Sequence, residues 1–385
     1  MENRDSAFQR LFGSLEDTRS FFAPGRVNVI GEHTDYNGGH VFPCALNIGT
    51  YATVRKRPDQ RVQMYSVNFP DQNRIEFDLE HVYYRDEDDW GNYPKGVIAQ
   101  FQQAGYTLNS GFEVVFEGNI PNGAGLSSSA SIELATAVLV NQLFHFNLDM
   151  LELVKMAQKA ENQFVGVHCG IMDQFSIGFG KKDHAVLLNC KTLAYSYSPI
   201  KLDGLTLMIA NTNKQRGLAD SKYNERRQEC ERALQALQQA YNVQNLCDLT
   251  LDEFRQCEQM IPDETDRKRA RHAISENERT LNAHHALVNG DLGRFGQLMN
   301  ESHQSLRDDY EVTGPELDTL VEAAWEYGAL GARMTGAGFG GCMVNVVESS
   351  RQEEFIRNVF RKYREKTGLE PSFYAVAIAD GAREL

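Results

Sequence analysis

The chain has 385 residues, of which 42% are hydrophobic and 24% charged, and its formal net charge is −14 at pH 7. Because a single core stops growing at about 250–300 residues, this length predicts two domains. The acidic balance argues against nucleic acid or an anionic membrane as the main partner, although a locally positive pocket would still accept an anionic small ligand. The first ten residues, MENRDSAFQR, do not resemble a signal peptide, and no apolar run is long enough to span a membrane.

The seven cysteines show no CxxC spacing and their number is odd. Reduced, buried thiols in a cytoplasmic protein explain this pattern better than a disulfide framework does. We therefore expect a cytoplasmic location and no chemistry at the cysteines.

Strands and helices mix along the chain without strict alternation. Segments rich in β-branched and aromatic residues predict strands at 40–56, 61–67, 112–117, a pair near 184–197, 201–210, 342–347 and 372–379. Apolar periodicity predicts helices from the glycines at 123–125 to residue 144, and over 149–165, 216–242, 263–289, 291–307, 315–327 and 350–366. This order indicates an α+β fold in two domains, residues 1–200 and 201–385, with a cleft between them.

Residues 25–40, GRVNVIGEHTDYNGGH, crowd an arginine, a glutamate, a histidine and an aspartate among apolar residues. Since Val27, Val29 and Ile30 separate these groups, the stretch is not a solvated run of charges. A metal-dependent hydrolase site is one hypothesis, and its ligands would be Glu32, His33, Asp35 and His40. Neither HExxH nor a paired-histidine spacing is present, which weighs against that hypothesis.

Residues 118–134, GNIPNGAGLSSSASIEL, place glycines directly before a predicted helix. Gly123 and Gly125 let the backbone approach a ligand closely. Ser127, Ser128 and Ser129 then fall at the helix start, where free N–H groups bind anions and hydroxyls add donors or a Mg²⁺ ligand. The alternative is a plain serine N-cap after a glycine turn, although capping needs one serine rather than three. The Walker pattern GxxxxGK[ST] is absent.

Two further segments carry candidate groups. Residues 331–342, GARMTGAGFGGC, contain a literal GxGxxG, but a strand follows it rather than a helix, which disfavours a dinucleotide site. We interpret this segment as a loop closing over a nucleotide, with a plain tight turn as the alternative. In 161–175, ENQFVGVHCGIMDQF, we expect Glu161 near a helix end and Asp173 as a semi-buried carboxylate at a turn. On the residues alone, an exposed Glu161 and a helix-capping or turn Asp173 are equally good explanations.

Taken together, GRVNVIGEHTDYNGG at 25–39, GAGLSSSAS at 123–131 and GARMTGAGFGGC at 331–342 closely resemble the three signature motifs of galactokinases. These enzymes belong to the superfamily that includes homoserine and mevalonate kinases. The resemblance implies two α+β domains with the active site between them. It also implies transfer of the γ-phosphoryl group of MgATP to the C1 hydroxyl of α-D-galactose. Positioning and electrostatics must then carry catalysis.

The resemblance assigns roles to individual residues. Asp173 matches the catalytic carboxylate that accepts the hydroxyl proton, and Arg26 the arginine beside it. Sugar-binding positions of the family match Glu32, His33, Thr34, Asp35, Gly170 and Tyr223. By periodicity alone Tyr223 reads as a core aromatic, and Thr34 is expected to contribute its backbone.

Nucleotide-binding positions follow from the same resemblance. The phosphate loop matches Gly123, Ala124, Gly125, Leu126, Ser127, Ser128 and Ser129. Ser129 and Glu161 match the Mg²⁺ ligands, since Mg²⁺ prefers a few hard oxygen ligands beside those of the phosphates. Ser66 and Trp90 fall where the family contacts the nucleotide. The visible departures, such as Val29 where many members carry leucine, are conservative.

Two alternatives keep the same fold. A non-catalytic galactose sensor would have a disrupted serine loop, whereas here that loop, Asp173 and Arg26 are all complete. A kinase acting on N-acetylgalactosamine would need a roomier pocket around C2, which a sequence does not reveal. We expect a monomer whose partners are galactose and MgATP.

Overall fold

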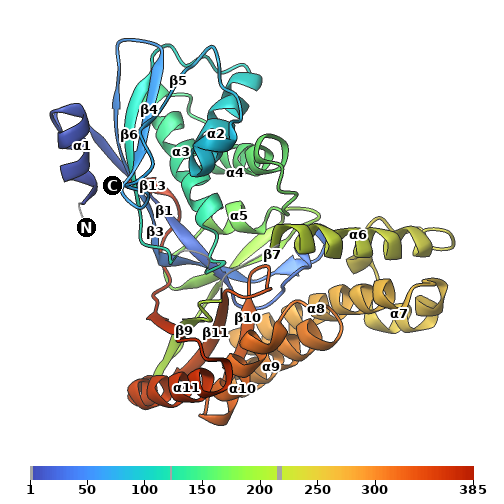
Figure 1. Cartoon of the computed structure of the whole chain (residues 1–385). Helices are drawn as coiled ribbons and strands as arrows, with labels where there is room; N and C mark the ends of the chain where they lie inside the picture. The colour runs from blue at the N-terminus through green and yellow to red at the C-terminus, as the bar shows by residue number, and fades with distance from the viewer. Residues whose placement is uncertain (1–2, 122–123, 215–218) are drawn as a thin grey trace.

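The computed structural model describes residues 3–121, 124–214 and 219–385, which form three β-sheets covered by helices (Figure 1). A six-stranded sheet and a four-stranded sheet form the centres of the upper and lower parts of the molecule in Figure 1. Within these residues, no helix is both long enough and apolar enough to cross a membrane. All seven cysteines are free thiols.

The six-stranded sheet has the order β13-β1-β3-β6-β4-β5. Its neighbouring strands are antiparallel except for β4 and β6, which run parallel. The strands are β1 (Arg19–Asn28), β3 (Pro43–Lys56), β4 (Arg61–Ser66), β5 (Ile75–Asp78), β6 (Phe112–Gly118) and β13 (Arg383–Glu384). One face carries α2 (Asn92–Gln103), α3 (Ser128–Phe144), α4 (Met150–Lys159) and α5 (Met172–Gly178), and the other carries α1 (Arg4–Phe12).

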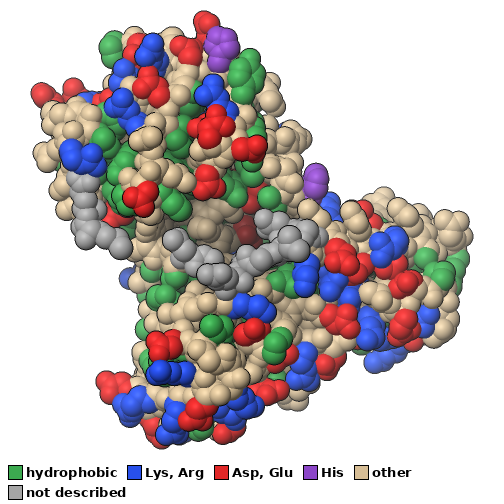
Figure 2. All heavy atoms as spheres, viewed as in Figure 1, with side chains coloured by type: hydrophobic (Ala, Val, Ile, Leu, Met, Phe, Trp, Pro, Cys, Tyr) green, Lys and Arg blue, Asp and Glu red, His purple; other side chains and the backbone are tan. Residues whose placement is uncertain are grey.

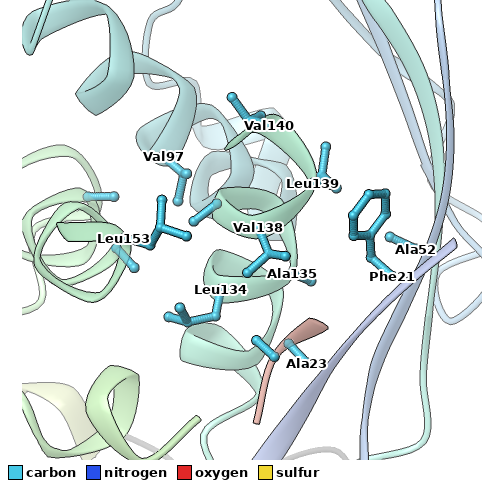
Figure 3. Close-up of a cluster of buried hydrophobic side chains, with 14 of the residues drawn as sticks. Phe21, Ala23, Ala52, Val97, Leu134, Ala135, Val138, Leu139, Val140 and Leu153 are labelled. Atoms are coloured by element: carbon cyan, nitrogen blue, oxygen red, sulfur yellow. The ribbon is translucent and has the colours of Figure 1, made fainter. Parts of the chain in front are cut away.

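Helix α3 lies in the middle of this part, with the sheet on one side and α2 and α4 on the other (Figure 3). Phe21 and Ala23 point from β1 toward α3. The intervening Phe22 is outside this cluster and packs against Tyr51, as expected from the two-residue period of a strand. Because α3 packs on both sides, its sequence SSASIELATAVLVNQLF is apolar nearly all round. This packing fixes the helix start, where the serines lie.

The four-stranded sheet is antiparallel throughout, in the order β10-β11-β9-β12. Along β9, Leu207 and Ile209 pack toward α8 and α9, whereas Met208 and Ala210 pack toward α10 and α11. The elements are β9 (Leu205–Asn211), β10 (Gly331–Thr335), β11 (Cys342–Glu348), β12 (Ser372–Ala375), α8 (Glu264–Val288), α9 (Leu292–Asp308), α10 (Gly314–Glu326) and α11 (Gln352–Thr367).

The remaining elements complete the molecule beside these two sheets. Helices α6 (Ala219–Leu237) and α7 (Leu251–Cys257) pack on α8 around a separate apolar cluster. The third sheet has three short strands, β2 (His40–Val41), β7 (His184–Asn189) and β8 (Tyr195–Pro199). On the face shown in Figure 2, acidic and basic side chains of the described residues are intermixed.

The α+β class is confirmed, with several local differences. The expectation that Asp173 lies at a turn is wrong, because it falls in the first turn of α5. Helix α2 was not predicted: its Pro94 and Gly96 read as breakers, although proline fits the first helical turn. Of the expected loop at 331–342, the first five residues are strand β10.

The division into 1–200 and 201–385 stays a prediction. It coincides with the passage from β8 in the three-stranded sheet to β9 in the four-stranded sheet. The chain nevertheless returns at its end, where β13 pairs with β1 of the six-stranded sheet.

Candidate active site

A tight turn after β1 presents three polar side chains to one cavity. Gly31 has φ of 102°, and a Cβ atom there would lie 2.8 Å from the Thr280 hydroxyl, so only glycine fits. The Thr34 hydroxyl donates to the carbonyl oxygens of Gly31 and His40, which closes the turn. Thr34 is not among the residues that line this cavity, and its expected backbone contact with the substrate stays a prediction.

This first cavity has a volume of about 130 Å³ and is lined from both parts of the molecule. It brings together seven of the eight predicted catalytic and substrate-binding residues, Thr34 being the exception. The lining is Arg26, Glu32, His33, Asp35, Glu161, Val167, Cys169, Gly170, Met172, Asp173, Tyr223, Gly336 and Ala337. Tyr223 therefore faces the cavity, although its spacing on α6 suggests a core residue.

Asp173 and Arg26 form a bidentate ion pair at the wall of this cavity. Arg26 Nε lies 2.8 Å from Asp173 Oδ1, and Nη2 lies 2.9 Å from Oδ2. The Ser127 hydroxyl donates to Asp173 Oδ2, and Arg26 Nη1 donates to the Gly125 carbonyl oxygen at 2.9 Å. Burial lowers the pKa of Arg26, but the charges of Asp173 and Glu32 outweigh it and raise the pKa, so this cation is permanent.

Two other carboxylates of the cavity bind protons unusually tightly. Burial, followed by the nearby charge of Asp173, raises the pKa of Asp35 to about 7. The same two causes raise the pKa of Glu161 to about 7. A site that holds several carboxylates beside one another is costly to fold, which is typical of sites built to bind a ligand.

Glu32 lines the cavity and also hydrogen-bonds to the glycine-rich loop. Its Oε1 accepts hydrogen bonds from the Thr335 hydroxyl at 3.0 Å and from the Gly336 N–H at 2.7 Å. Arg333 Nη2 lies 3.4 Å from the same oxygen and is fully buried. Glu32 thus joins the turn after β1 to the strand β10 of the other sheet.

The loop at 336–341 packs against the serine-rich segment. Gly336 has φ of 85°, and a Cβ atom there would lie 2.8 Å from the Gly125 carbonyl oxygen. Gly336 and Ala337 line the first cavity, and no residue of 336–341 lines the second cavity described next. The expectation that this loop closes over a nucleotide stays a prediction; in this structure Gly336 and Ala337 form part of the wall of the first cavity.

The second cavity, of about 220 Å³, lies at the start of α3. Ser128 and Ser129 line it at the N-terminal end of the helix, where free N–H groups and the helix dipole favour anions. Ser127 takes a left-handed φ of 61° and makes no capping bond, so the N-cap alternative is wrong. The other lining residues are Thr50, Ser66, Asn68, Phe69, Asp89, Trp90, Tyr93, Phe116, Gly118, Ile120 and Ile132.

The predicted phosphate-loop residues have different surroundings in the structure. Ser128 and Ser129 line the second cavity, and Ser127 reaches Asp173. Gly125 supplies a carbonyl to Arg26, while Ala124 and Leu126 are buried in an apolar cluster. Gly123 lies outside the described residues.

Comparison with known proteins supports a kinase of one family. Residues 6–56 match the galactokinase galactose-binding signature, 92–181 the GHMP kinases N terminal domain, and 283–365 the GHMP kinases C terminal model. The galactokinase of Clostridium acetobutylicum is 60% identical over 99% of this chain and 98% of its own length. That of Bacillus subtilis is 57% identical over 100% and 99%. The chain belongs to the galactokinase family.

Solved structures agree with this family at the level of the fold. The Lactococcus lactis galactokinase, crystallised with galactose, is 48% identical, and its TM-score is 0.97 over 99% of this chain and 98% of that one. The Methanococcus jannaschii mevalonate kinase, at 17% identity and a TM-score of 0.67 over 94% and 98%, shares the fold alone.

Sequence reasoning missed several lining residues of this galactokinase family member. Phe69 lies parallel to Trp90, with ring centroids 6.4 Å apart, and both line the second cavity, which makes one wall apolar and flat. Tyr93 lies on α2, which was not predicted. Sequence reasoning also missed Gln174, which lines neither cavity but whose amide donates to Glu161 Oε2 at 2.6 Å. These side chains read as ordinary core residues in the sequence.

Proposed function

We propose that this chain transfers the γ-phosphoryl group of ATP to the C1 hydroxyl of α-D-galactose, giving galactose 1-phosphate. Membership of the galactokinase family supports galactose phosphorylation. The observation that carries the mechanism is the position of Asp173. It lines the first cavity, and Ser127, next to the serines of the second cavity, bonds to it.

The first cavity holds the sugar in this proposal. Asp35 and Glu32 are acceptors for hydroxyl groups, and His33 and Tyr223 complete the polar wall. Gly170 is necessary because a Cβ atom there would lie 1.8 Å from Asp35 Oδ2. A sugar that lacks the matching hydroxyl would leave a buried carboxylate unpaired, at a cost of about 1–3 kcal/mol.

The second cavity holds ATP. Phe69 and Trp90 give this cavity an apolar, flat wall suited to a flat base. The start of α3 at Ser128 and Ser129 suits the phosphates, and Ser66 lies among the polar lining residues. The γ-phosphoryl group would thereby point toward Asp173 and Arg26.

Ser129 and Glu161 fit a Mg²⁺ site by their chemistry. Glu161 is buried, and within the described residues no lysine or arginine forms an ion pair with it; its partners are the Gln174 amide and the Cys169 thiol. The Ser129 hydroxyl lies close enough to lower the pKa of Glu161. A buried carboxylate without a cation is the kind of group that binds metal. When bound, Mg²⁺ would neutralise charge on the phosphates.

Asp173 acts as the base and Arg26 as the electrostatic partner. Each Asp173 oxygen already accepts from Arg26, yet a carboxylate has further lone pairs with which to take the hydroxyl proton. Proton transfer helps only as the new phosphorus–oxygen bond forms, because a sugar hydroxyl is a very weak acid. The fixed charge of Arg26 then stabilises the negative charge on the phosphoryl group.

The test combines purified protein, MgATP and a sugar, follows ADP release and identifies the product by ³¹P NMR. We expect turnover with α-D-galactose and a phosphate on C1. Turnover only with N-acetylgalactosamine would favour the sister kinase. Galactose binding without turnover would favour the sensor. Either result would overturn the proposal.

A further inference from the structure

A chain of hydrogen bonds leads from the first cavity into the core. His33 Nδ1 lies 2.7 Å from the Tyr36 hydroxyl, which lies 2.7 Å from the Tyr310 hydroxyl. The Tyr310 hydroxyl in turn lies 3.2 Å from Cys230 Sγ. At the far end, Asn37 Nδ2 donates to Cys230 Sγ at 3.7 Å. These groups come from the turn after β1, from α6 and from the residues after α9.

The amide at the far end sets the direction of this chain. Asn37 Nδ2 also lies 2.8 Å from the His33 carbonyl oxygen, which can only accept. The amide nitrogen must therefore face both partners, and Cys230 Sγ receives a hydrogen from it. The thiol hydrogen is then free to donate to Tyr310, Tyr310 to Tyr36, and Tyr36 to His33 Nδ1.

The opposite direction leaves a buried donor unpaired. If His33 Nδ1 donated to Tyr36, then Tyr310 would donate to Cys230, and the thiol hydrogen would have no acceptor in the chain. Cys230 is 1% exposed, so that hydrogen would also be hidden from water. In the first direction, every hydroxyl and thiol of the chain both donates and accepts.

None of these groups carries a charge near neutral pH. Burial, followed by the neighbouring His272, lowers the pKa of His33 to about 3. Burial raises the pKa of Cys230 to about 11 and raises the pKa values of Tyr36 and Tyr310 well above their usual range. His33 is thus a neutral imidazole with one ring proton, and the direction of these hydrogen bonds decides which ring nitrogen carries that proton.

We propose that Tyr36 and Tyr310 are positioning residues that hold His33 as the tautomer protonated at Nε2. That nitrogen is buried and makes no hydrogen bond to any described residue, while its ring lines the first cavity. The backbone carbonyl of Ala337, on the same wall, raises the pKa of His33, as an oxygen facing a ring N–H would. Nε2–H therefore faces this carbonyl at the cavity wall and is itself hidden from solvent.

The consequence for recognition rests on the proposed function. Glu32 and Asp35, when ionised, can only accept hydrogen bonds, so they bind hydroxyl groups of the sugar that donate to them. His33 Nε2–H can only donate, and because it is buried it acts on the Ala337 segment of the cavity wall rather than on the sugar itself. The tautomer of His33 therefore fixes the part of the wall, at Ala337, against which the sugar meets these carboxylates.

The experiment is ¹⁵N-histidine NMR on the whole protein, with the His33 signal assigned by its loss in His33→Gln. We expect the proton on Nε2 in the wild type and a galactose-dependent shift of that N–H signal. Tyr36→Phe removes the donor to Nδ1, so both tautomers should appear and the KM for galactose should rise about tenfold, with the KM for ATP unchanged.

The matched control is Tyr363→Phe, which removes a buried hydroxyl that donates to the Thr212 carbonyl far from the cavity. It should leave the His33 signals and both KM values as in the wild type. A proton on Nδ1 in the wild type, or a Tyr36→Phe protein with unchanged tautomer and unchanged galactose KM, would overturn the proposal. If the wild type held the Nε2–H tautomer yet showed no galactose turnover, the proposed function alone would fail.

Discussion

Replacement of Asp35 by asparagine should stabilise the ligand-free protein above neutral pH. The pKa of this carboxyl is about 7 in the folded chain, because of burial and the charge of Asp173, against about 3.9 for an unfolded aspartate. The folded state therefore holds the proton more tightly. The resulting cost to folding is absent well below pH 4, grows as the pH rises, and is complete above pH 7.

The pKa difference sets the size of the effect. About three pKa units correspond to about 4 kcal/mol at pH 8 if the whole shift is lost. Because Asp35 is only partly buried, solvent screening should reduce this to about 2 kcal/mol. At pH 5 the same reasoning leaves about 1 kcal/mol or less. Asparagine keeps the shape of the side chain and carries no charge.

The assay is urea unfolding followed by circular dichroism at pH 5 and pH 8, without ligands. The Asp35→Asn protein should exceed the wild type in free energy of unfolding at pH 8, and the difference should shrink at pH 5. Asp203→Asn, an exposed aspartate outside both cavities, is the control and should change neither value. If Asp35→Asn were no more stable than the wild type at pH 8, the ionised Asp35 side chain would not destabilise the folded protein, and the reasoning would be refuted.

Three further substitutions separate the two cavities in initial-rate kinetics. Gly170→Ala places a Cβ atom 1.8 Å from Asp35 Oδ2. The KM for galactose should therefore rise about tenfold or more, with the KM for ATP unchanged. An unchanged galactose KM would contradict the placement of galactose in the first cavity. Trp90→Ala should raise the KM for ATP about tenfold, because stacking on the base is lost, and should leave the KM for galactose unchanged. A rise in the galactose KM alone would refute the placement of the nucleotide in the second cavity. Glu161→Gln should raise the Mg²⁺ concentration for half-maximal rate and weaken Mn²⁺ binding measured by electron paramagnetic resonance; equal Mn²⁺ affinity would exclude Glu161 as a ligand.

The glycine- and serine-rich motifs made much of the site predictable. The turn at 30–39 needs glycine at position 31 and polar groups beside buried ones, and the sequence alone shows that combination. Ser127 is different: the sequence placed it at a helix start, but its left-handed backbone and its bond to Asp173 depend on how β1, α3 and α5 meet.

Residues that support the site from the core could not be predicted. Arg333 stands in the segment that the sequence suggests is a loop, yet it is fully buried beside Glu32, because β10 packs against the turn after β1. Tyr310 and Cys230 look like ordinary apolar positions, and only the fold brings them to Tyr36. A local pattern does not encode contacts between elements that lie hundreds of residues apart.

The role of Asp173 is the central claim, and one rate constant tests it most directly. The measurement is kcat of Asp173→Asn at saturating galactose and MgATP, where altered substrate affinity no longer matters. Loss of the base should lower kcat by about 10²–10⁴-fold. A kcat close to that of the wild type would contradict the assignment of Asp173 as the base and would require another acceptor for the hydroxyl proton.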